Sequence, residues 1–285
     1  MKKHTVLYSI IILLLFFCFP EVIISSSTSY YFRTLGINDG LSQSTVNAIL
    51  QDQKGFMWIG TKDGLNQYDG QECRVFQKEN SSLGNNFITA LYEDCEGYIW
   101  VGTDAGVYIY NPVQEAFQFL DTEIASSGEK ITRAVTWITS DSQNNIWISV
   151  DNQGLFCYNR GKKNLTKVVS CGESGIANVT HFWFYAGQLW IARYEDNLYV
   201  SKDNSSFNAF NDVDGEDIFK GLVINSYVEG LHNCLYVGTS KGLMEINLTS
   251  RKVRKLLDEY VRDICFRSDT DLWIGTEQGL YIYNI

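Results

Sequence analysis

The sequence predicts an all-β fold, a β-propeller with six repeats of four strands each, and three observations carry this prediction. The 285 residues include 7 Trp, 17 Tyr and 16 Phe beside 23 Gly and only 2 Pro, a composition that favours strands joined by tight glycine turns. A tetrapeptide of the Trp-Ile-Gly-Thr type recurs six times. Its copies lie about 43 residues apart on average, which is the length of a propeller blade.

Residues 1–29 are predicted to be a signal peptide. Lys2 and Lys3 precede a nearly unbroken apolar run over residues 6–19, and the small residues 25–29 suit a signal peptidase. This run is shorter than the about 20 residues of a membrane span. An uncleaved anchor, with the run extended to Ile24, is the alternative. We expect an exported, periplasmic protein whose propeller domain covers residues 30–285.

Each repeat is expected to supply four strands. A β-branched first strand, such as residues 46–50, leads into a turn that begins with Asp. This Asp accepts backbone N–H bonds, and the Gly or Asn three residues later tolerates positive φ. The second strand carries the tetrapeptide, a glycine hairpin leads into the third strand, and a fourth strand follows in most repeats. The six repeats are centred on Trp58, Trp100, Trp147, Trp190, Tyr236 and Trp273.

Residues that recur in every blade are predicted to be structural. The recurring Trp offers a large apolar surface suited to packing between neighbouring blades, and the recurring Asp is a turn former, not half of an acid/base pair. The structural positions of the first two repeats are Asp52, Trp58, Gly60, Gly64, Asp94, Trp100, Gly102 and Gly106.

The segments Asp52 to Leu65 and Asp94 to Val107, with the lead-in Asp39 to Ser42, resemble the two-component regulator propeller repeat. This repeat belongs to the periplasmic half of sensor histidine kinases and hybrid two-component regulators, commonly of Bacteroidetes. The resemblance implies an oligosaccharide-responsive sensor that controls a kinase across the inner membrane. It also implies a second propeller and a homodimer in the full-length sensor. The chain itself shows no phosphoacceptor histidine motif, so we expect a non-enzymatic amino-terminal part of a histidine kinase, without a cofactor.

The closure of the ring has two solutions. The sixth repeat supplies strands at residues 261–266, 272–275 and 280–284, and no fourth strand follows. Tyr30 to Thr34 is an unassigned segment that would complete this blade and close a six-bladed ring. The family resemblance instead favours seven blades, with one blade missing from this chain, and we favour this second solution.

Candidate ligand contacts are the residues that break the repeat, because a local violation without a structural reason is where function is expected. Arg193 replaces the Thr of the tetrapeptide, and His181 and Trp183 lie on the preceding strand. Trp137 and Arg133 occupy comparable positions one blade earlier. These five residues combine cationic groups with aromatic rings, which suits an acidic or neutral glycan. A blade that has drifted without function is the alternative.

Composition excludes other function classes. The formal net charge of −10 argues against nucleic-acid binding, which needs a Lys and Arg surplus. The isolated histidines and scattered cysteines show no metal-ligand spacing, and no catalytic residues are predicted. The alternatives to a sensor are an exported propeller enzyme that acts on glycans, as a lyase or hydrolase, and a protein-interaction scaffold.

Overall fold

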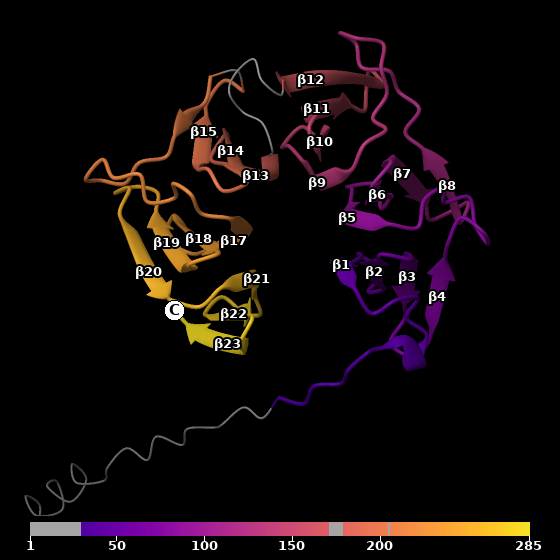
Figure 1. Ribbon diagram of the computed structural model, residues 1–285, viewed down its shortest axis with the longest axis horizontal. Coiled ribbons are helices and arrows are strands. Elements are labelled where there is room, and N and C mark those ends of the chain that lie inside the picture. The colour runs from indigo at the N-terminus through magenta and orange to yellow at the C-terminus, as the bar shows by residue number, and fades with distance from the viewer. Residues whose placement is uncertain (1–29, 171–178, 205) are drawn as a thin grey trace, which may run out of the picture. The chain divides into compact units, whose positions relative to one another are not determined.

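The computed structural model describes residues 30–170, 179–204 and 206–285. The predicted signal peptide, residues 1–29, lies outside the described residues. The chain divides into two units, residues 1–35 and residues 36–285, which we treat separately. All strands of the described residues belong to the second unit (Figure 1). No helix within the described ranges is long and apolar enough to cross a membrane.

The first three blades are four-stranded antiparallel sheets in which consecutive strands pair. Blade 1 consists of β1 (Val46–Gln51), β2 (Met57–Thr61), β3 (Gly64–Tyr68) and β4 (Cys73–Phe76). Blade 2 consists of β5 (Ile88–Glu93), β6 (Ile99–Thr103), β7 (Gly106–Asn111) and β8 (Ala116–Phe119). Blade 3 consists of β9 (Val135–Ser140), β10 (Ile146–Val150), β11 (Gly154–Asn159) and β12 (Asn164–Ser170).

Blades 4 and 5 repeat this order, and blade 6 has three strands. Blade 4 consists of β13 (Val179–Tyr185), β14 (Gln188–Arg193), β15 (Leu198–Ser201) and β16 (Asn208–Ala209). Blade 5 consists of β17 (Ile224–Glu229), β18 (Cys234–Thr239), β19 (Gly242–Asn247) and β20 (Val253–Leu257). Blade 6 consists of β21 (Val261–Phe266), β22 (Asp271–Thr276) and β23 (Gly279–Asn284). The predicted all-β propeller with six repeats is confirmed.

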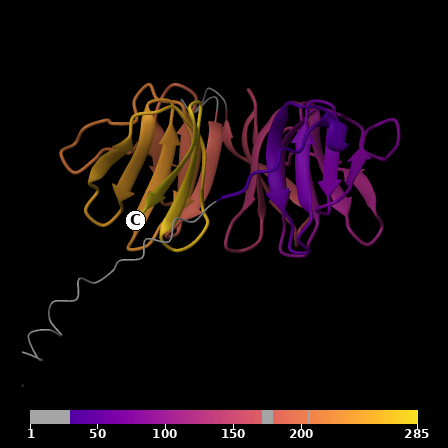
Figure 2. The same ribbon diagram turned by 90° about the horizontal axis from the view of Figure 1, so that it is seen from below.

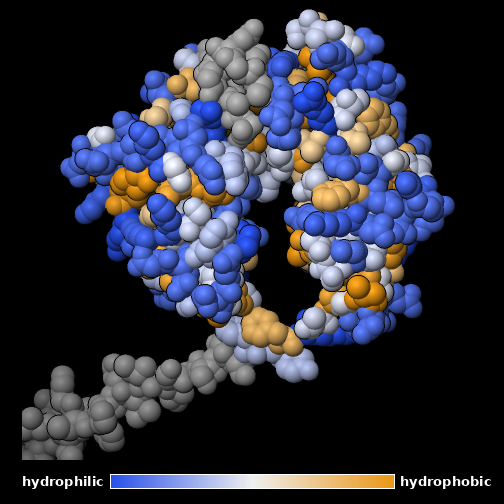
Figure 3. Space-filling model, in the orientation of Figure 1, coloured by the Kyte–Doolittle hydropathy of each residue, from blue (hydrophilic) through white to orange (hydrophobic). Residues whose placement is uncertain are grey.

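The blades follow one another around a central channel. The first strand of each blade lies innermost, and the later strands lie progressively outward (Figure 1). The strands run between two faces formed by turns and loops (Figure 2). The space-filling view shows an opening through the middle of the ring (Figure 3). This arrangement places the side chains of six innermost strands around one axis.

The recurring Asp and Trp are joined by a hydrogen bond. Asp52 Oδ1 accepts the backbone N–H groups of Lys54 and Phe56 at 3.0 and 2.9 Å, which forms the turn between β1 and β2. Asp52 Oδ2 accepts the indole N–H of Trp58 at 2.8 Å. The same indole bond recurs in blades 2 and 3, at 2.7 and 2.8 Å. The turn former therefore also fixes the orientation of the Trp ring.

Each of these Trp rings packs against the next blade. The ring centroids of Trp58 and Tyr110 are 5.0 Å apart, those of Trp100 and Tyr158 are 5.6 Å apart, and Trp147 lies 4.9 Å from Phe184. Trp58 and Trp100 are 1% and 2% exposed. The indoles thus close the space between blades, where aromatic pairs contribute beyond their buried area.

Glycines of the tetrapeptide allow a close approach between blades. A Cβ at Gly60 would lie 2.5 Å from Ile88 Cγ2, and a Cβ at Gly102 would lie 2.8 Å from Val135 Cγ1. In both pairs the β-branched residue begins the innermost strand of the next blade. At Gly275 the nearest atom to such a Cβ is the Asp263 carbonyl oxygen, at 3.6 Å. We call the space beside the tetrapeptide glycine the glycine notch. In blade 6 no residue of another blade, within the described ranges, fills the notch at Gly275.

The sheet faces between blades 6 and 1 are exposed where the other blades are buried. Val46 is 39% exposed, whereas the equivalent first-strand residues of the other five blades are 0–4% exposed. Leu280 is 44% exposed, whereas its five equivalents on the third strands are fully buried at 0%. Blades 1 and 6 thus face an opening, and both sides of it have the apolar surface of a blade-to-blade contact.

The alternative in which Tyr30 to Thr34 completes the last blade is not what the structure shows. These residues adopt no strand, and the sheet of β21, β22 and β23 has three members. An added strand buries alternate side chains on one face. Tyr31 and Phe32 are adjacent in the sequence and are 96% and 65% exposed, so this segment lacks the alternation that a strand needs.

The glycine notch gives a matched pair of variants. We expect Gly102→Ala to lower the free energy of unfolding by about 1–3 kcal/mol, because the added methyl overlaps Val135. Gly275→Ala adds the same methyl where no blade packs, and it should leave stability unchanged. Urea unfolding of both variants measures the difference, and equal losses would contradict the packing described here.

Candidate functional site in the central channel

One position of the innermost strands differs strongly between blades. It pairs with the third residue of the tetrapeptide, as Ala48 pairs with Gly60. Blades 1 and 2 carry alanine at this position, whereas blades 3 to 6 carry larger or polar side chains. The residues of blades 3 to 6 are Trp137, His181, Ser226 and Asp263.

Trp137 and His181 form the centre of this group. Their ring centroids lie 4.6 Å apart, with the ring planes tilted by 55°. Trp137 Nε1 and His181 Nδ1 are buried and have no hydrogen-bond partner among the described residues. Buried polar atoms are normally hydrogen-bonded, so these two atoms are available to a ligand, a property that the indole nitrogens of Trp183 and Trp190 share.

The His181 imidazole is held neutral. Burial lowers its pKa from 6.5 to about 4, although the charge of Asp263 and a hydrogen bond to the backbone of Ile224 act in the opposite direction. The residue is half-buried, and its Nδ1 atom is buried. A neutral imidazole has one donor and one acceptor nitrogen, so this group is able to accept a hydrogen bond from a hydroxyl at neutral pH.

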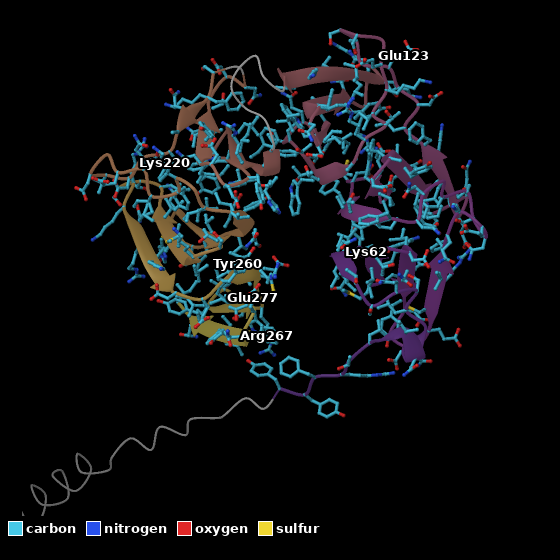
Figure 4. All side chains as sticks on the ribbon, viewed as in Figure 1. Lys62, Glu123, Lys220, Tyr260, Arg267 and Glu277 are labelled. Carbon is cyan, nitrogen blue, oxygen red and sulfur yellow. The ribbon has the colours of Figure 1, made fainter. Side chains whose placement is uncertain are left out.

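Ser226 and Asp263 continue the group onto blades 5 and 6. Ser226 Oγ donates to Asp263 Oδ1 at 2.6 Å and accepts the backbone N–H of Ile264 at 3.2 Å. Lys62 of blade 1 and Glu277 of blade 6 lie on opposite sides of the opening (Figure 4). The polar group therefore lies on the innermost strands of blades 3 to 6, at the position where blades 1 and 2 carry alanine.

The other predicted contacts lie elsewhere. Arg193 Nη1 forms an ion pair with Asp196 at 2.6 Å and contacts the Tyr199 hydroxyl at 3.3 Å. Both partners lie toward β15, on the side away from the innermost strand. Arg133 is exposed in the segment before β9. The structure thus does not bring these two arginines together with His181.

Trp183 is a packing residue in this structure. It is 1% exposed, and its ring stacks on Tyr227 of blade 5 at 4.1 Å. It also lies 6.0 Å from Trp190 in a parallel orientation. His181 and Trp183 both contact blade 5, one through the Ile224 backbone and the other through Tyr227.

Sequence reasoning missed Ser226 and Asp263. The signal that could have found them is the strand register, because both residues occupy the position of Ala48 in their repeats. Within the described residues, no group of His, Cys, Asp and Glu side chains has the arrangement of a metal site. We call Trp137, His181, Ser226 and Asp263 the channel group. Together they offer a ligand an aromatic ring, a neutral imidazole, a hydroxyl and a carboxylate.

Comparisons with known proteins agree with the repeat. The family model "Two component regulator propeller" matches residues 40–63, 82–105 and 255–278. Histidine kinase P4 of Formosa agariphila is 40% identical over 53 residues, which make up 19% of this chain and 4% of the kinase.

Solved structures share the fold. The extracellular domain of the hybrid two component system BT3049 from B. thetaiotaomicron is 27% identical, with a TM-score of 0.73 over 89% of this chain and 35% of that chain. Virginiamycin B lyase from Staphylococcus aureus has a TM-score of 0.60 at 11% identity, over 85% of this chain and 84% of that chain, which shows the fold alone. The chain spans about a third of the length of the matched extracellular-domain chain. Three stretches of the chain thus match the two component regulator propeller model, and the fold is similar to that of a two-component extracellular domain.

Proposed function

We propose that this chain is the periplasmic ligand-sensing propeller of a two-component sensor and that its ligand is an oligosaccharide. The observation that carries the proposal is the likeness to an extracellular two-component domain over 89% of the chain, together with the matched repeats. The signal peptide predicted for residues 1–29 accords with this location. In a longer sensor, a histidine kinase would report binding.

The channel group supports a sugar ligand. Trp137 offers an aromatic surface, and aromatic rings with a polar tip are common where one side of a ligand is apolar and the other is hydroxylated. Its indole N–H donates to a hydroxyl oxygen, and His181 Nδ1 accepts from a hydroxyl. Asp263, on blade 6, adds a hydrogen-bond acceptor to those of blades 3 and 4. Sugars carry hydroxyls that donate and accept at once, so they match this set.

The opening between blades 1 and 6 supports a further part of the proposal. Val46 and Leu280 have the exposure of residues that lack their neighbouring blade. We propose that an additional blade packs there in a longer sensor, where a second propeller and a homodimer are also proposed. No nucleic acid takes part in this function.

Titration calorimetry of the full chain with neutral oligosaccharides tests the proposed site. Trp137→Ala should weaken binding about ten-fold, because it removes a stacking surface and a donor. Arg193→Ala, whose guanidinium pairs with Asp196, should bind as the unchanged protein does. Equal affinities for both variants, or a loss confined to Arg193→Ala, would contradict the channel site.

A further inference from the structure

Blade 4 lacks the carboxylate that orients the Trp in blades 1 to 3. A two-residue turn, Ala186-Gly187 with φ of 49° and 73°, joins β13 and β14. Phe184 pairs with Leu189, and Tyr185 pairs with Gln188, so Tyr185, not Phe184, occupies the position of the Asp. Counting six residues back from Trp190, the Asp-to-Trp spacing of blades 1 to 3, leads to Phe184 instead, because this hairpin is one residue shorter.

The Trp190 indole consequently has no acceptor. Trp190 is 3% exposed, and its buried Nε1 has no hydrogen-bond partner among the described residues. In blades 1 to 3 the equivalent nitrogen donates to Asp52, Asp94 or Asp141. A buried N–H without a partner has lost its hydrogen bonds to water with no replacement, so a ligand group that accepts this bond gains affinity.

A cavity borders the place where this acceptor would lie. It has a volume of about 640 Å³ and is bounded by blades 4 and 5. Trp190 is among its lining residues, and so are Tyr185 and Gln188, the pair that closes the shortened hairpin. The lining also includes Lys202, Phe210 and Arg251. Volumes of this size accommodate small-molecule ligands.

The equivalent cleft between blades 1 and 2 has the opposite charge. Its lining includes Asp52, Glu93 and Glu115, and Glu115 Oε2 pairs with Arg74 at 2.7 Å. Arg251 occupies the position of Glu115 three blades further on. Each lies four residues after the Asn that ends the third strand, and each has a positive φ, 59° for Arg251 and 51° for Glu115. The cleft of blades 4 and 5 thus lacks the two carboxylates that correspond to Asp52 and Glu115. It contains instead the guanidinium of Arg251 and an indole N–H of Trp190 that has no acceptor among the described residues.

Arg251 is held in a fixed orientation at the cavity. Its Nε and Nη2 donate to the backbone oxygen of Asn211 at 3.1 and 2.6 Å, and its Cζ lies 5.0 Å from the Phe210 ring centroid. Over the described ranges, neither Arg251 nor Lys202 forms an ion pair with a carboxylate. The acidic lining residue Asp203 accepts hydrogen bonds from Ser201 and from Ser206.

We propose that this cavity binds a small organic carboxylate of the sugar-acid class. One carboxylate oxygen accepts the Trp190 indole N–H, as Asp52 does from Trp58, and Arg251 and Lys202 balance the charge. Hydrogen bonds to an ionised acceptor are stronger than neutral ones. The site is separate from the channel and does not depend on oligosaccharide binding there.

Indole N–H signals in the NMR spectrum of the full chain test the proposal. D-glucuronate is the probe, and D-glucose, which has a hydroxymethyl group in place of the carboxylate, is its neutral control. Trp190→Phe keeps the packed ring and identifies the Trp190 signal by its loss. We expect glucuronate to shift that signal in a saturable way and glucose to leave it in place.

Affinities of two arginine variants complete the test. Arg251→Gln should weaken glucuronate binding about ten-fold, and Arg74→Gln, at the equivalent cleft of blades 1 and 2, should leave it unchanged. Both side chains are exposed, so folding is expected to be retained, and the dispersion of the NMR spectrum checks it. Equal shifts with glucose and glucuronate, no shift with either, or equal effects of both arginine variants would overturn the proposal.

Discussion

Trp100→Ala is expected to lower the free energy of unfolding by about 3–5 kcal/mol. The substitution leaves a large cavity between blades 2 and 3, where the indole is 2% exposed and packs on Tyr158, and truncation of a buried aromatic has this cost. It also removes the donor that Asp94 Oδ2 accepts at 2.7 Å. A loss of this size is a large fraction of the stability of a typical domain.

Val113→Ala is the control for this truncation. Val113 is apolar but 90% exposed, so its loss creates no cavity and should change stability by less than about 0.5 kcal/mol. Chemical unfolding monitored by circular dichroism compares the two variants. Similar midpoints for Trp100→Ala and Val113→Ala would contradict the assignment of the Trp ring to the space between blades.

Acidification from pH 6.5 to pH 4 is expected to remove about 2–3 kcal/mol of stability through His181 alone. Its pKa in the folded protein is lowered to about 4, whereas the unfolded chain has the ordinary value of about 6.5. Between these values the unfolded state binds a proton that the folded state does not, so stability falls as pH falls. Partial solvent contact keeps the effect below the full value of the shift.

His181→Gln isolates this contribution, because glutamine does not titrate. The variant should lose stability less steeply than the unchanged protein over this pH window, while carboxylates contribute equally to both. His232→Asn, at an exposed turn position with φ of 56°, should retain the steep dependence. Parallel stability curves for His181→Gln and the unchanged protein would show that His181 is not buried as described.

The fold was predictable because it repeats. An Asp turn, a Trp strand and a glycine hairpin are local patterns, and six copies at one spacing leave few alternatives to a propeller. The indole bond between Asp52 and Trp58 was also within reach, since the two residues are six apart in each of the first three repeats. The alternative strand at Tyr30 to Thr34 rested on the need to close the ring and not on the sequence pattern of the segment, and the structure shows no strand there.

The candidate site was only partly predictable. Trp137 and His181 stand out because they break the repeat, and the structure places their rings in contact. Arg193 breaks the repeat equally, but the direction of its side chain depends on Asp196 and Tyr199, which no repeat pattern reveals. Ser226 and Asp263 join the group only once the strand register brings four blades to one level of the channel.

The acceptor position at Trp190 shows the limit of alignment by spacing. A hairpin shortened by one residue moves Tyr185 into the position of the Asp, and the shift is invisible when residues are counted from the Trp. The missing carboxylate is therefore a property of the turn and not of a single substitution.

Binding without turnover is the central claim for this chain, and one titration tests it directly. The full chain is saturated with an oligosaccharide in the calorimeter, and the recovered sugar is then analysed by chromatography. The account predicts saturable heat together with an unchanged oligosaccharide. Cleavage products that disappear with Asp263→Asn would contradict it and identify the channel group as a catalytic site.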